Sequence, residues 1–438
     1  MKLLRGFGRL IRQTGALLTA SGVRARIGDL CWGYFDAHAR KDGPNDCVAL
    51  QVVGFDAERV VLLPLGAADR LFPGMLVSDG VAPPIPIANY ARGRVIDGFG
   101  RPIDAGPPLP MTHDGQRSFV PSPLQRAPIR EPFDTGVRAI NGLFTVGEGQ
   151  RVGLFAGSGV GKSVLLSMLA RAPAVDVVVC ALIGERGREV ESFVRMLFAD
   201  GAHNVIVVAA PASDAPGLRL RAAQLAHDLA DAERAAGRRV LLLFDSLSRV
   251  AQAQREIGLA AGEPPTSKGY PPSVFTLLPG LVERGGTLIN AGSITAFYTV
   301  LMEEDDPDDP ILDAARAVLD GHILLSRESA ERGLYPAIDV GASASRLALD
   351  LQHDDWANAA RAFRRAWRAI ENTRDLVLVG AYEAGSDADV DRALAMKTAL
   401  EAYLAQEPAQ QCDLSTAEEL LLALMRAGDS GLPRVDAV

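Results

Sequence analysis

The stretch Gly153-Leu154-Phe155-Ala156-Gly157-Ser158-Gly159-Val160-Gly161-Lys162-Ser163 decides the fold of this 438-residue chain. A short apolar run of strand type at residues 151–155 leads into it, and residues 164–170 are apolar and helix-forming. A glycine-rich turn between a strand and a helix lets backbone N–H groups converge on phosphate oxygens, because no Cβ blocks their approach. The start of the helix adds its positive dipole end. We therefore expect a phosphate-binding loop.

The loop follows the G-x-x-x-x-G-K-[ST] pattern, except that Ala156 stands at the first glycine position. In this pattern the lysine, Lys162, reaches the β- and γ-phosphates, and the hydroxyl of Ser163 binds Mg²⁺. The alternative is a chance glycine-rich turn, which the flanking strand and helix patterns disfavour. We expect ATP to be bound by Ala156, Gly157, Ser158, Gly159, Val160, Gly161, Lys162, Ser163 and Val164.

Composition excludes several classes of protein. The net charge of −9 disfavours a nucleic-acid-binding protein, which needs a basic stripe, although a local basic groove stays open. The four cysteines and six histidines show no spacing typical of a metal site or a disulfide framework, and the thiols are expected to be buried or incidental. No apolar stretch approaches the roughly 20 residues that a membrane helix needs. We expect a cytoplasmic enzyme.

Residues 1–14 are expected to form a basic amphipathic helix. Apolar residues would lie on one face and basic residues on the other: Leu3, Leu4, Phe7, Leu10 and Ile11 against Lys2, Arg5, Arg9 and Arg12. A frayed terminal helix, weakened by Gly6 and Gly8, is one interpretation. A docking helix for a partner protein or an anionic membrane surface is the other.

Three further regions follow from the pattern of apolar runs and turn residues. Residues 15–92 contain short strand-like runs at 48–55, 59–64 and 74–78 between turn signals, which is typical of a small β-barrel or sandwich. A turn-rich junction at 93–104 and a proline-rich linker at 107–132 come next. From residue 134 to about 350, strands and helices alternate, which predicts an α/β doubly wound core. Residues 351–438 are expected to be helical.

The individual elements can be named by their ranges. Expected buried parallel strands of the core are 175–183, 205–210, 240–244 and 287–294. Expected helices are 189–198 and 219–236 in the core, and 356–373, 387–405 and 416–426 in the C-terminal region.

Two acidic residues follow apolar strands of the core. Asp245 ends the run Leu241-Leu242-Leu243-Phe244, at the sheet edge where open α/β sheets bind ligands. We expect it to hold Mg²⁺ directly or through water. Glu185 follows residues 177–183 and is our candidate for polarising the attacking water. A solvated charged turn is the alternative for Glu185.

Two candidates come from the end of the core. Arg346, in Ser343-Ala344-Ser345-Arg346, is a candidate arginine finger that reaches into a neighbouring subunit's site and stabilises the transferring phosphoryl group. A surface salt bridge is the default for a lone arginine. Tyr335, before Pro336, offers an aromatic face for stacking on adenine, and a core tyrosine is the alternative.

Together these residues resemble the RecA-like ATPases of the rotary ATP synthase and type III secretion family, and most closely its flagellar export branch. The resemblance covers nearly the whole chain. It rests on the stretches 93–104, 156–166, 181–190, 258–275, 292–300 and 380–387. The 258–275 loop is typical of the secretion branch. The resemblance implies a RecA-like P-loop ATPase domain at 93–350, between an N-terminal small β-barrel and a C-terminal helical domain.

The resemblance also implies roles and partners. Glu185 matches the catalytic glutamate, Arg186 a residue near the γ-phosphate, Arg346 the finger and Tyr335 the adenine platform. One chain that carries both Glu185 and Arg346 implies a homohexamer. The family implies a stator-like regulatory protein at the N-terminal helix, a central stalk-like protein, export-gate membrane proteins and chaperone–substrate complexes. It also implies a peripheral location at the inner-membrane export apparatus.

The chain departs from the family pattern at two places, and other functions stay open. Arg374 precedes Asp375 where an acidic residue is usual, and residues 343–347 are a less typical variant, which puts partner contacts in doubt. An injectisome secretion ATPase, a catalytic subunit of a rotary synthase, a ring-shaped RNA translocase and a non-hydrolysing structural subunit are the competing hypotheses. The acidic balance disfavours the translocase, and Glu185 disfavours the non-hydrolysing subunit.

Overall fold

The computed structural model describes residues 6–35, 46–66, 69–112, 120–173, 175–199, 203–302 and 309–429. The chain forms two compact units. The first contains residues 1–120, 179–235 and 244–284, and the second contains residues 121–178, 236–243 and 285–438. This division cuts across the expected boundaries at residues 92 and 350, so those domain boundaries stay a prediction.

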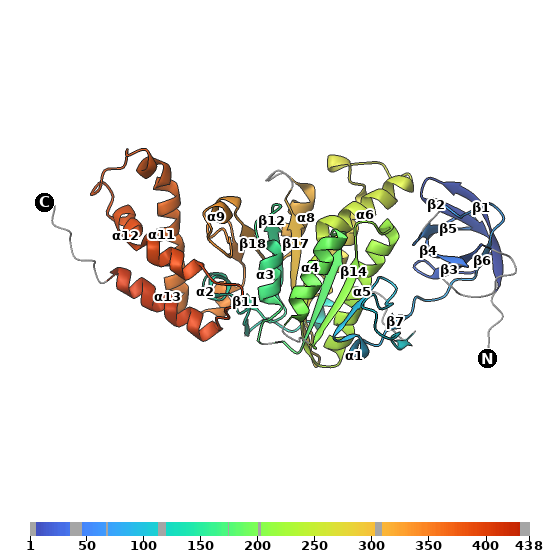
Figure 1. Ribbon diagram of the computed structural model, residues 1–438, viewed down its shortest axis with the longest axis horizontal. Coiled ribbons are helices and arrows are strands. Elements are labelled where there is room, and N and C mark those ends of the chain that lie inside the picture. The colour runs from blue at the N-terminus through green and yellow to red at the C-terminus, as the bar shows by residue number, and fades with distance from the viewer. Residues whose placement is uncertain are drawn as a thin grey trace. The chain divides into compact units, whose positions relative to one another are not determined.

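A closed six-stranded barrel begins the first unit (Figure 1). Its strand order is β1-β2-β5-β4-β3-β6. The strands are β1 (Phe7–Thr14), β2 (Leu17–Ser21), β3 (Leu30–Tyr34), β4 (Cys47–Asp56), β5 (Arg59–Pro64) and β6 (Leu76–Ser78). Leu18, Leu50 and Leu62 fill its interior and are fully buried. Closure leaves no free strand edge, because the antiparallel pairing of β1 with both β2 and β6 completes the ring.

The expected N-terminal helix is wrong for the residues that the structure describes. Residues 7–14 form β1, and Leu10 lies in the barrel core at 3% exposure. Gly8 shows why the strand is favoured: a Cβ there would lie 2.1 Å from the carbonyl oxygen of Ser21, so only glycine fits between the paired backbones. Glycine is also a poor helix former, and a short helix gains too little to compete with sheet pairing. Residues 1–5 lie outside the described residues.

One mixed nine-stranded sheet forms the α/β core, with the strand order β19-β18-β12-β17-β15-β13-β14-β8 and β16 paired to β17. Strand β12 runs parallel to both β17 and β18. The strands are β8 (Arg94–Ile96), β12 (Arg151–Ala156), β13 (Val177–Ile183), β14 (Val205–Ala210), β15 (Arg239–Asp245), β16 (Gly286–Thr287), β17 (Ser293–Leu301), β18 (Gly321–Leu325) and β19 (Ala344–Ser345). Smaller strands are β7 (Ile85–Pro86), β9 (Met111–Thr112), β10 (Pro132–Phe133) and β11 (Val146–Gly147).

Helices of the core follow the predicted alternation. The first unit contains α1 (Ala88–Ala91), α4 (Gly187–Phe198), α5 (Pro216–Ala235), α6 (Leu247–Ala260) and α7 (Pro272–Val282). The second unit contains α2 (Arg138–Leu143), α3 (Lys162–Leu169), α8 (Pro310–Val318), α9 (Arg327–Glu331) and α10 (Ala348–Leu351). Strands that are buried along their whole length, such as β13 and β14, confirm the prediction of a buried sheet covered by helices.

One expected strand, at residues 287–294, is wrong. β16 ends at Thr287 and β17 begins at Ser293, and the chain turns between them. Asn290 has a φ of 59°, and Ile289 is 56% exposed, so this part of the apolar run does not lie in the sheet. A Cβ at Gly292 would lie 2.0 Å from the carbonyl oxygen of Arg238, which fixes the turn against the start of β15. The central strand therefore runs to Leu301.

The C-terminal region is helical, as predicted, with α11 (Asp354–Leu378), α12 (Ala388–Leu404) and α13 (Leu414–Asp429). These helices contact α2 of the same unit (Figure 1). The side chain of Arg138 on α2 donates hydrogen bonds to carbonyl oxygens at the end of α12, including that of Tyr403 at 2.6 Å. The indole of Trp356 donates to the carbonyl of Gly142 at 2.9 Å. None of the helices among the described residues is both long and apolar enough to cross a membrane.

His227 on α5 predicts a pH dependence of stability. Its ring is buried, lies 2.8 Å from the carbonyl oxygen of Ala223, and packs against Phe244. Burial, aided by the positive charge of Arg284, lowers the pKa of His227 to about 3. The unfolded chain binds a proton near the ordinary pKa of 6.5, whereas the folded chain does not, so His227 costs stability as the pH falls below 6.5.

We expect His227→Gln to remove this cost. Between pH 6 and pH 4 the free energy of unfolding of the variant should fall less steeply than that of the wild type, by about 1.4 kcal/mol per pH unit. Urea unfolding at a series of pH values measures the slope. The exposed His203 serves as the control, because His203→Gln should leave the slope unchanged. Equal slopes for the His227 variant and the wild type would contradict the prediction.

Candidate functional site

The glycine-rich loop joins β12 to α3 in the second unit. Ala156, the last residue of β12, pairs with Leu301 of β17 on one side and with Leu325 of β18 on the other. Its backbone is that of a strand and its side chain is fully buried. An alanine therefore fits at this position, because the chain turns only after it. The sequence alone does not explain why the first glycine of the G-x-x-x-x-G-K-[ST] pattern is replaced by alanine.

The backbone of the loop needs glycine at two later positions. Gly159 has a φ of 80° and Gly161 a φ of 95°, both in the left-handed region that side chains disfavour. Gly161 precedes Lys162, where α3 begins, and its carbonyl accepts the hydrogen bond of Leu165 N. Val160 is buried and anchors the loop, while Ser158, Ser163 and Val164 are exposed and Lys162 is half-buried. The start of α3 therefore presents its N–H groups beside a lysine and a hydroxyl.

Tyr335 lies against this loop. A Cβ at Gly161 would lie 3.3 Å from Cε1 of the Tyr335 ring, so the two residues are in close contact. The ring is nevertheless 41% exposed, which leaves part of its surface open beside the loop. The carbonyl of Tyr335 accepts a hydrogen bond of 2.8 Å from Gln406 N, which holds the residue from the C-terminal region. The structure thus brings Tyr335 to the predicted nucleotide-binding loop.

Gly159 and Gly161 give a matched pair of substitutions. Gly159→Ala meets open space and should cost only the left-handed strain, about 1 kcal/mol of stability. Gly161→Ala should cost more and weaken ATP binding further, because the new Cβ must displace Tyr335. Thermal unfolding and the affinity for a fluorescent ATP analogue measure the two effects. When each glycine variant is combined with Tyr335→Ala, the two variants should differ less in unfolding midpoint and in affinity for the analogue. If they differ as much as before, contact with Tyr335 does not cause the larger effect of Gly161→Ala.

Arg346 follows the short strand β19 in the same unit. Its backbone N–H donates to the carbonyl of Asp320 at 3.0 Å, and its exposed guanidinium donates to the carbonyl of Arg316 at 3.2 Å. The carboxylate of Asp320 forms a two-pronged ion pair with the guanidinium of Arg151, the first residue of β12. Arg346 is therefore attached at the amino end of β12, whereas the glycine-rich loop leaves its carboxyl end. The length of β12 separates them, roughly 16 Å at the usual rise per residue.

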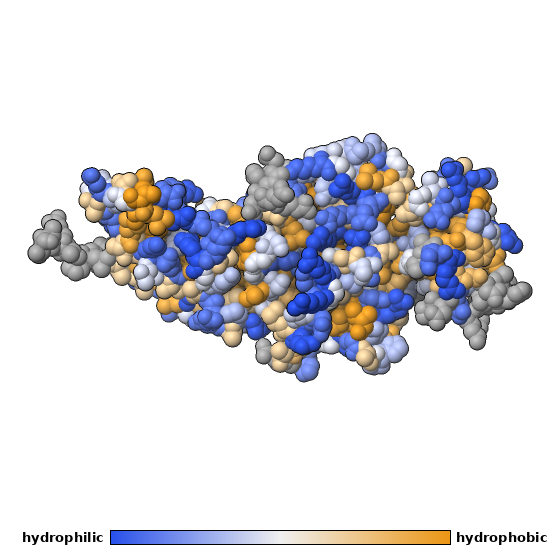
Figure 2. Space-filling view, turned by 45° about the horizontal axis from the view of Figure 1, so that its top comes forward, coloured by the Kyte–Doolittle hydropathy of each residue, from blue (hydrophilic) through white to orange (hydrophobic). Residues whose placement is uncertain are grey.

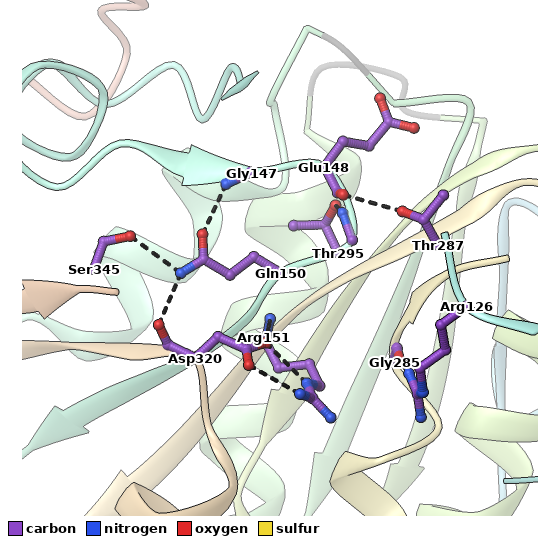
Figure 3. Close-up of polar contacts among 11 residues, drawn as sticks. Arg126, Gly147, Glu148, Gln150, Arg151, Gly285, Thr287, Thr295, Asp320 and Ser345 are labelled. Atoms are coloured by element: carbon purple, nitrogen blue, oxygen red, sulfur yellow. Dashed lines mark hydrogen bonds and ion pairs between the residues drawn. The ribbon is translucent and has the colours of Figure 1, made fainter. Parts of the chain in front are cut away.

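A polar network holds the segment before Arg346 in place (Figure 3). Gln150 donates to the hydroxyl of Ser345 at 3.1 Å and to the carbonyl of Asp320 at 3.1 Å. Ser345 in turn donates to the carbonyl of Thr145 at 2.9 Å. Gln150 and Gln406 could not be predicted as supporting residues, because neither lies in a recognisable motif. Some of their partners lie far away along the chain, such as Ser345 for Gln150 and Gly136 for Gln406.

The remaining candidates belong to the first unit. Glu185 follows β13 through Gly184, which has a φ of 72° and contacts the side chain of Arg249. Glu185 is half-buried, and its carbonyl accepts a hydrogen bond of 3.0 Å from Ala212 N. Arg186 caps the start of α4, is exposed, and lies 3.6 Å from Glu189. The loop, Tyr335 and Arg346 thus lie in one unit, while Glu185 and Arg186 lie in the other.

Asp245 ends β15 and is buried, with 5% of its surface exposed. The next residue, Ser246, caps α6 by accepting a hydrogen bond of 3.3 Å from Arg249 N. Burial raises the pKa of the Cys180 thiol, and the negative charge of Asp245 raises it further. The prediction of a buried strand that ends in a carboxylate is confirmed, and the metal role of Asp245 stays a prediction.

The described part of the chain holds neither a metal-binding cluster nor a disulfide outside the glycine-rich loop. There, no group of three or more His, Cys, Asp or Glu side chains is arranged to hold a metal ion. Cys31, Cys47, Cys180 and Cys412 are buried, as expected, and the structure records each as a free thiol.

A parallel strand, a left-handed glycine loop and a helix that begins with Lys-Ser define the chain as a P-loop nucleotide-binding protein with a RecA-like core. Residues 136–345 match the model of the ATP synthase alpha/beta family, nucleotide-binding domain, and residues 353–423 match that of the T3SS EscN ATPase C-terminal domain. The chain belongs to the family of ATPases that includes the flagellum-specific ATP synthases and the type 3 secretion system ATPases.

Individual relatives are similar over almost their whole length. The flagellum-specific ATP synthase of Salmonella typhimurium is 49% identical over 94% of this chain and 91% of its own. The flagellum-specific ATP synthase of Pseudomonas aeruginosa is 46% identical over 97% of this chain and 94% of its own. The type 3 secretion system ATPase of Xanthomonas euvesicatoria is 42% identical over 96% and 94%. The assembled ATPase EscN of enteropathogenic E. coli superposes with a TM-score of 0.86 at 37% identity, over 95% of this chain and 99% of that chain. The predicted fold class and ATPase activity are confirmed.

Proposed function

We propose that this protein is a homohexameric ATPase that energises the export of flagellar proteins by a type III apparatus. Hydrolysis would release substrates from their chaperones and unfold them at the membrane export gate. The observation that carries the proposal is the near full-length similarity to the flagellum-specific ATP synthases, at 49% and 46% identity. The identity to the type 3 secretion system ATPase of Xanthomonas euvesicatoria is lower, at 42%, and an injectisome ATPase is therefore the second candidate.

The loop residues would bind the phosphates of ATP. Backbone N–H groups from Gly157 to Ser163 and the Nζ of Lys162 would hold the β- and γ-phosphates, and the exposed face of Tyr335 would stack on adenine. Support for the last role is the contact of Tyr335 with Gly161 and its partial exposure. The hydroxyl of Ser163 and the carboxylate of Asp245 are oxygen ligands of the kind that Mg²⁺ takes. When bound with ATP, Mg²⁺ neutralises negative charge on the phosphates.

Glu185 would activate water for attack on the γ-phosphate. A carboxylate that accepts a proton or orients water lowers the barrier, and the half-burial of Glu185 at a strand end suits this role. Arg186, exposed at the start of α4, would interact with the γ-phosphate. These assignments come from matching the family motif, residue by residue.

Arg346 supports a ring of identical subunits. Because it is attached at the amino end of β12, away from its own loop, its guanidinium is available to a site on another subunit. A neighbouring subunit in a ring would receive this charge next to its γ-phosphate, where it stabilises the transition state. The similarity to the assembled EscN ATPase supports the ring.

A central stalk-like protein is the partner with most support. One similar structure is that of EscN in complex with its central stalk EscO. The match to that structure covers 95% of this chain and 99% of that chain. Figure 2 shows hydrophobic residues gathered at one end of the helical region. Leu378 and Val379, at the end of α11, are 75% and 76% exposed, which is unusual for such side chains. We propose that this end of α11 contacts the stalk.

The remaining partners follow from the proposed export role. They are a stator-like regulatory protein, export-gate membrane proteins and chaperone–substrate complexes. The location that fits them is the cytoplasm, at the inner-membrane export apparatus. Because residues 7–14 belong to the barrel, the proposed regulatory contact cannot use the basic helix expected over residues 1–14.

Two experiments test the proposal. The ATPase activity of the purified chain should rise more than proportionally with its concentration, because complete sites form only on assembly. A rotary synthase subunit would stay inactive without its partner subunits, and stimulation by RNA would favour a translocase. Deletion of the gene should abolish filament assembly and leave injectisome secretion intact. Intact filaments with lost secretion would establish the injectisome alternative instead.

A further inference from the structure

A cavity of about 500 Å³ lies in the second unit, between one face of α11 and the segment before Arg346. Four arginines of α11 line it: Arg361, Arg364, Arg365 and Arg368. Their spacing of three and four residues places them on one face of the helix. The size of the cavity is within the range of small-molecule sites. Its lining includes no Asp or Glu.

The positive charges of this arginine cavity are only partly offset by the protein, since Arg368 interacts electrostatically with Glu371, whose pKa is raised by burial. Within the described residues, none of the four arginines forms an ion pair; Arg361 donates to the amide oxygen of Asn358, and Nε of Arg364 lies 3.4 Å from the carbonyl of Ala360. Burial lowers the pKa of Arg364, and the charges of Arg361 and Arg368 lower it further. Arg151 in the same unit, by contrast, is paired with Asp320. The cavity is thus a concentrated positive site in a chain of net charge −9.

The opposite wall adds hydrogen-bond donors. Ser343 is buried, and its hydroxyl accepts the N–H of Leu324 at 3.0 Å, which leaves the hydroxyl proton to be donated. The amide of Asn372 also lines the cavity. Two carboxylates stand near Gly341, those of Asp339 and Glu371, and Glu371 accepts the indole N–H of Trp367 at 2.7 Å. A second cavity that shares Arg365 contains Asp355, so the arginine cavity is the more positive of the two.

We propose that the arginine cavity binds a phosphate-bearing anion, as a site separate from the glycine-rich loop. Guanidinium groups match the oxygens of phosphate with paired hydrogen bonds, and several arginines on one helical face can share one polyanion. Binding relieves the mutual repulsion of the four charges. The source is either a soluble phosphate compound or a lipid headgroup. The inference does not depend on the proposed hydrolysis or on Glu185.

The test uses the full chain with Lys162→Ala, so that the loop is weakened as a competing site. Pyrophosphate without Mg²⁺ is titrated by calorimetry, with the intrinsic fluorescence of the three tryptophans as a second readout. We expect saturable binding that weakens with salt, and a rise in the thermal unfolding midpoint. Adding Arg361→Gln and Arg365→Gln should weaken binding at least about tenfold. Both arginines are exposed, so these changes preserve the fold better than replacing the half-buried Arg364.

Arg392→Gln in the same Lys162→Ala background is the matched control. Arg392 is an exposed arginine on α12 outside the cavity, 3.9 Å from Asp389, and its replacement should leave pyrophosphate binding unchanged. The proposal is overturned if pyrophosphate and anionic vesicles both fail to bind. It is also overturned if the Arg361 and Arg365 changes have no larger effect than the control. Circular dichroism and the unfolding midpoint verify that each variant is folded.

Vesicles distinguish the two sources of phosphate. Sedimentation with phosphatidylcholine vesicles, and with vesicles of phosphatidylcholine and phosphatidylglycerol in equal parts, measures lipid binding. Arginine-dependent binding to the mixed vesicles alone identifies a headgroup site, whereas binding of pyrophosphate alone identifies a soluble ligand. Poly-glutamate serves as a competitor of another class. If it binds through the same arginines while neither phosphate source does, the site is one for acidic proteins and the proposal is wrong.

Discussion

Glu185→Gln is expected to reduce ATP hydrolysis by about 10²- to 10⁴-fold, the usual contribution of a general base, while nucleotide binding stays intact. The amide has nearly the same size as the carboxylate, so the half-buried position after β13 should tolerate it. It cannot take a proton, however, and it carries no charge with which to polarise water. Steady-state hydrolysis and the affinity for a fluorescent ATP analogue separate the two effects.

Glu191→Gln is the control for this prediction. Glu191 lies on α4, close to Glu185 in sequence, and is exposed in an ion pair with Arg195. Its replacement removes a surface charge and should leave the hydrolysis rate within about twofold of the wild type. If Glu185→Gln hydrolyses ATP like this control, then Glu185 belongs to a solvated turn and another residue activates the water.

Arg346→Ala is expected to reduce hydrolysis by about 10³- to 10⁵-fold, the usual contribution of an arginine finger. Its affinity for ATP should change little, because the loop and Tyr335 of the same subunit remain. Arg346→Lys should recover only part of the rate, since an ammonium lacks the planar fork of guanidinium. Stability should be nearly unchanged, because the guanidinium is exposed and, among the described residues, its hydrogen bond is to the carbonyl of Arg316. Arg392→Ala is the matched control at an exposed arginine.

Mixing the two inactive proteins tests whether the site is shared. In a ring that contains both variants, an Arg346→Ala subunit still has Glu185, and a Glu185→Gln neighbour can supply it with Arg346. Random mixing in equal amounts should make roughly a quarter of the interfaces complete, so activity should return. Exchange of subunits is checked by fluorescence transfer. Mixed rings with no recovered activity would mean that Arg346 acts within its own subunit.

Sequence predicted those elements whose structure is decided by neighbours along the chain. The loop, β12 and α3 are encoded in one continuous stretch, and the helix expected at residues 356–373 lies within α11. The N-terminal segment is different. Residues 7–10 alternate in burial as a strand, whereas residues 11–14 are all exposed. The segment also shows a helical face, and pairing with β2 and β6 decides in favour of the strand.

The positions at which strands begin and end within an apolar run also could not be predicted from a local pattern. Residues 287–294 are as apolar as a strand, but the chain turns at Asn290 because the strand register places Gly292 against Arg238. A register is a property of two segments together, and a single segment does not contain it.

By itself, the sequence determined that this protein has a phosphate-binding loop, an α/β core and a close relation to the type III export ATPases, because each is encoded in continuous stretches. Tertiary structure alone decided that Tyr335 lies against Gly161, that Arg346 is attached at the amino end of β12, and that the arginines of α11 face residues 340–343 across a cavity. These contacts join segments that are far apart along the chain. They arise from sheet register and close packing, which depend on many weak contacts at once rather than on any local pattern.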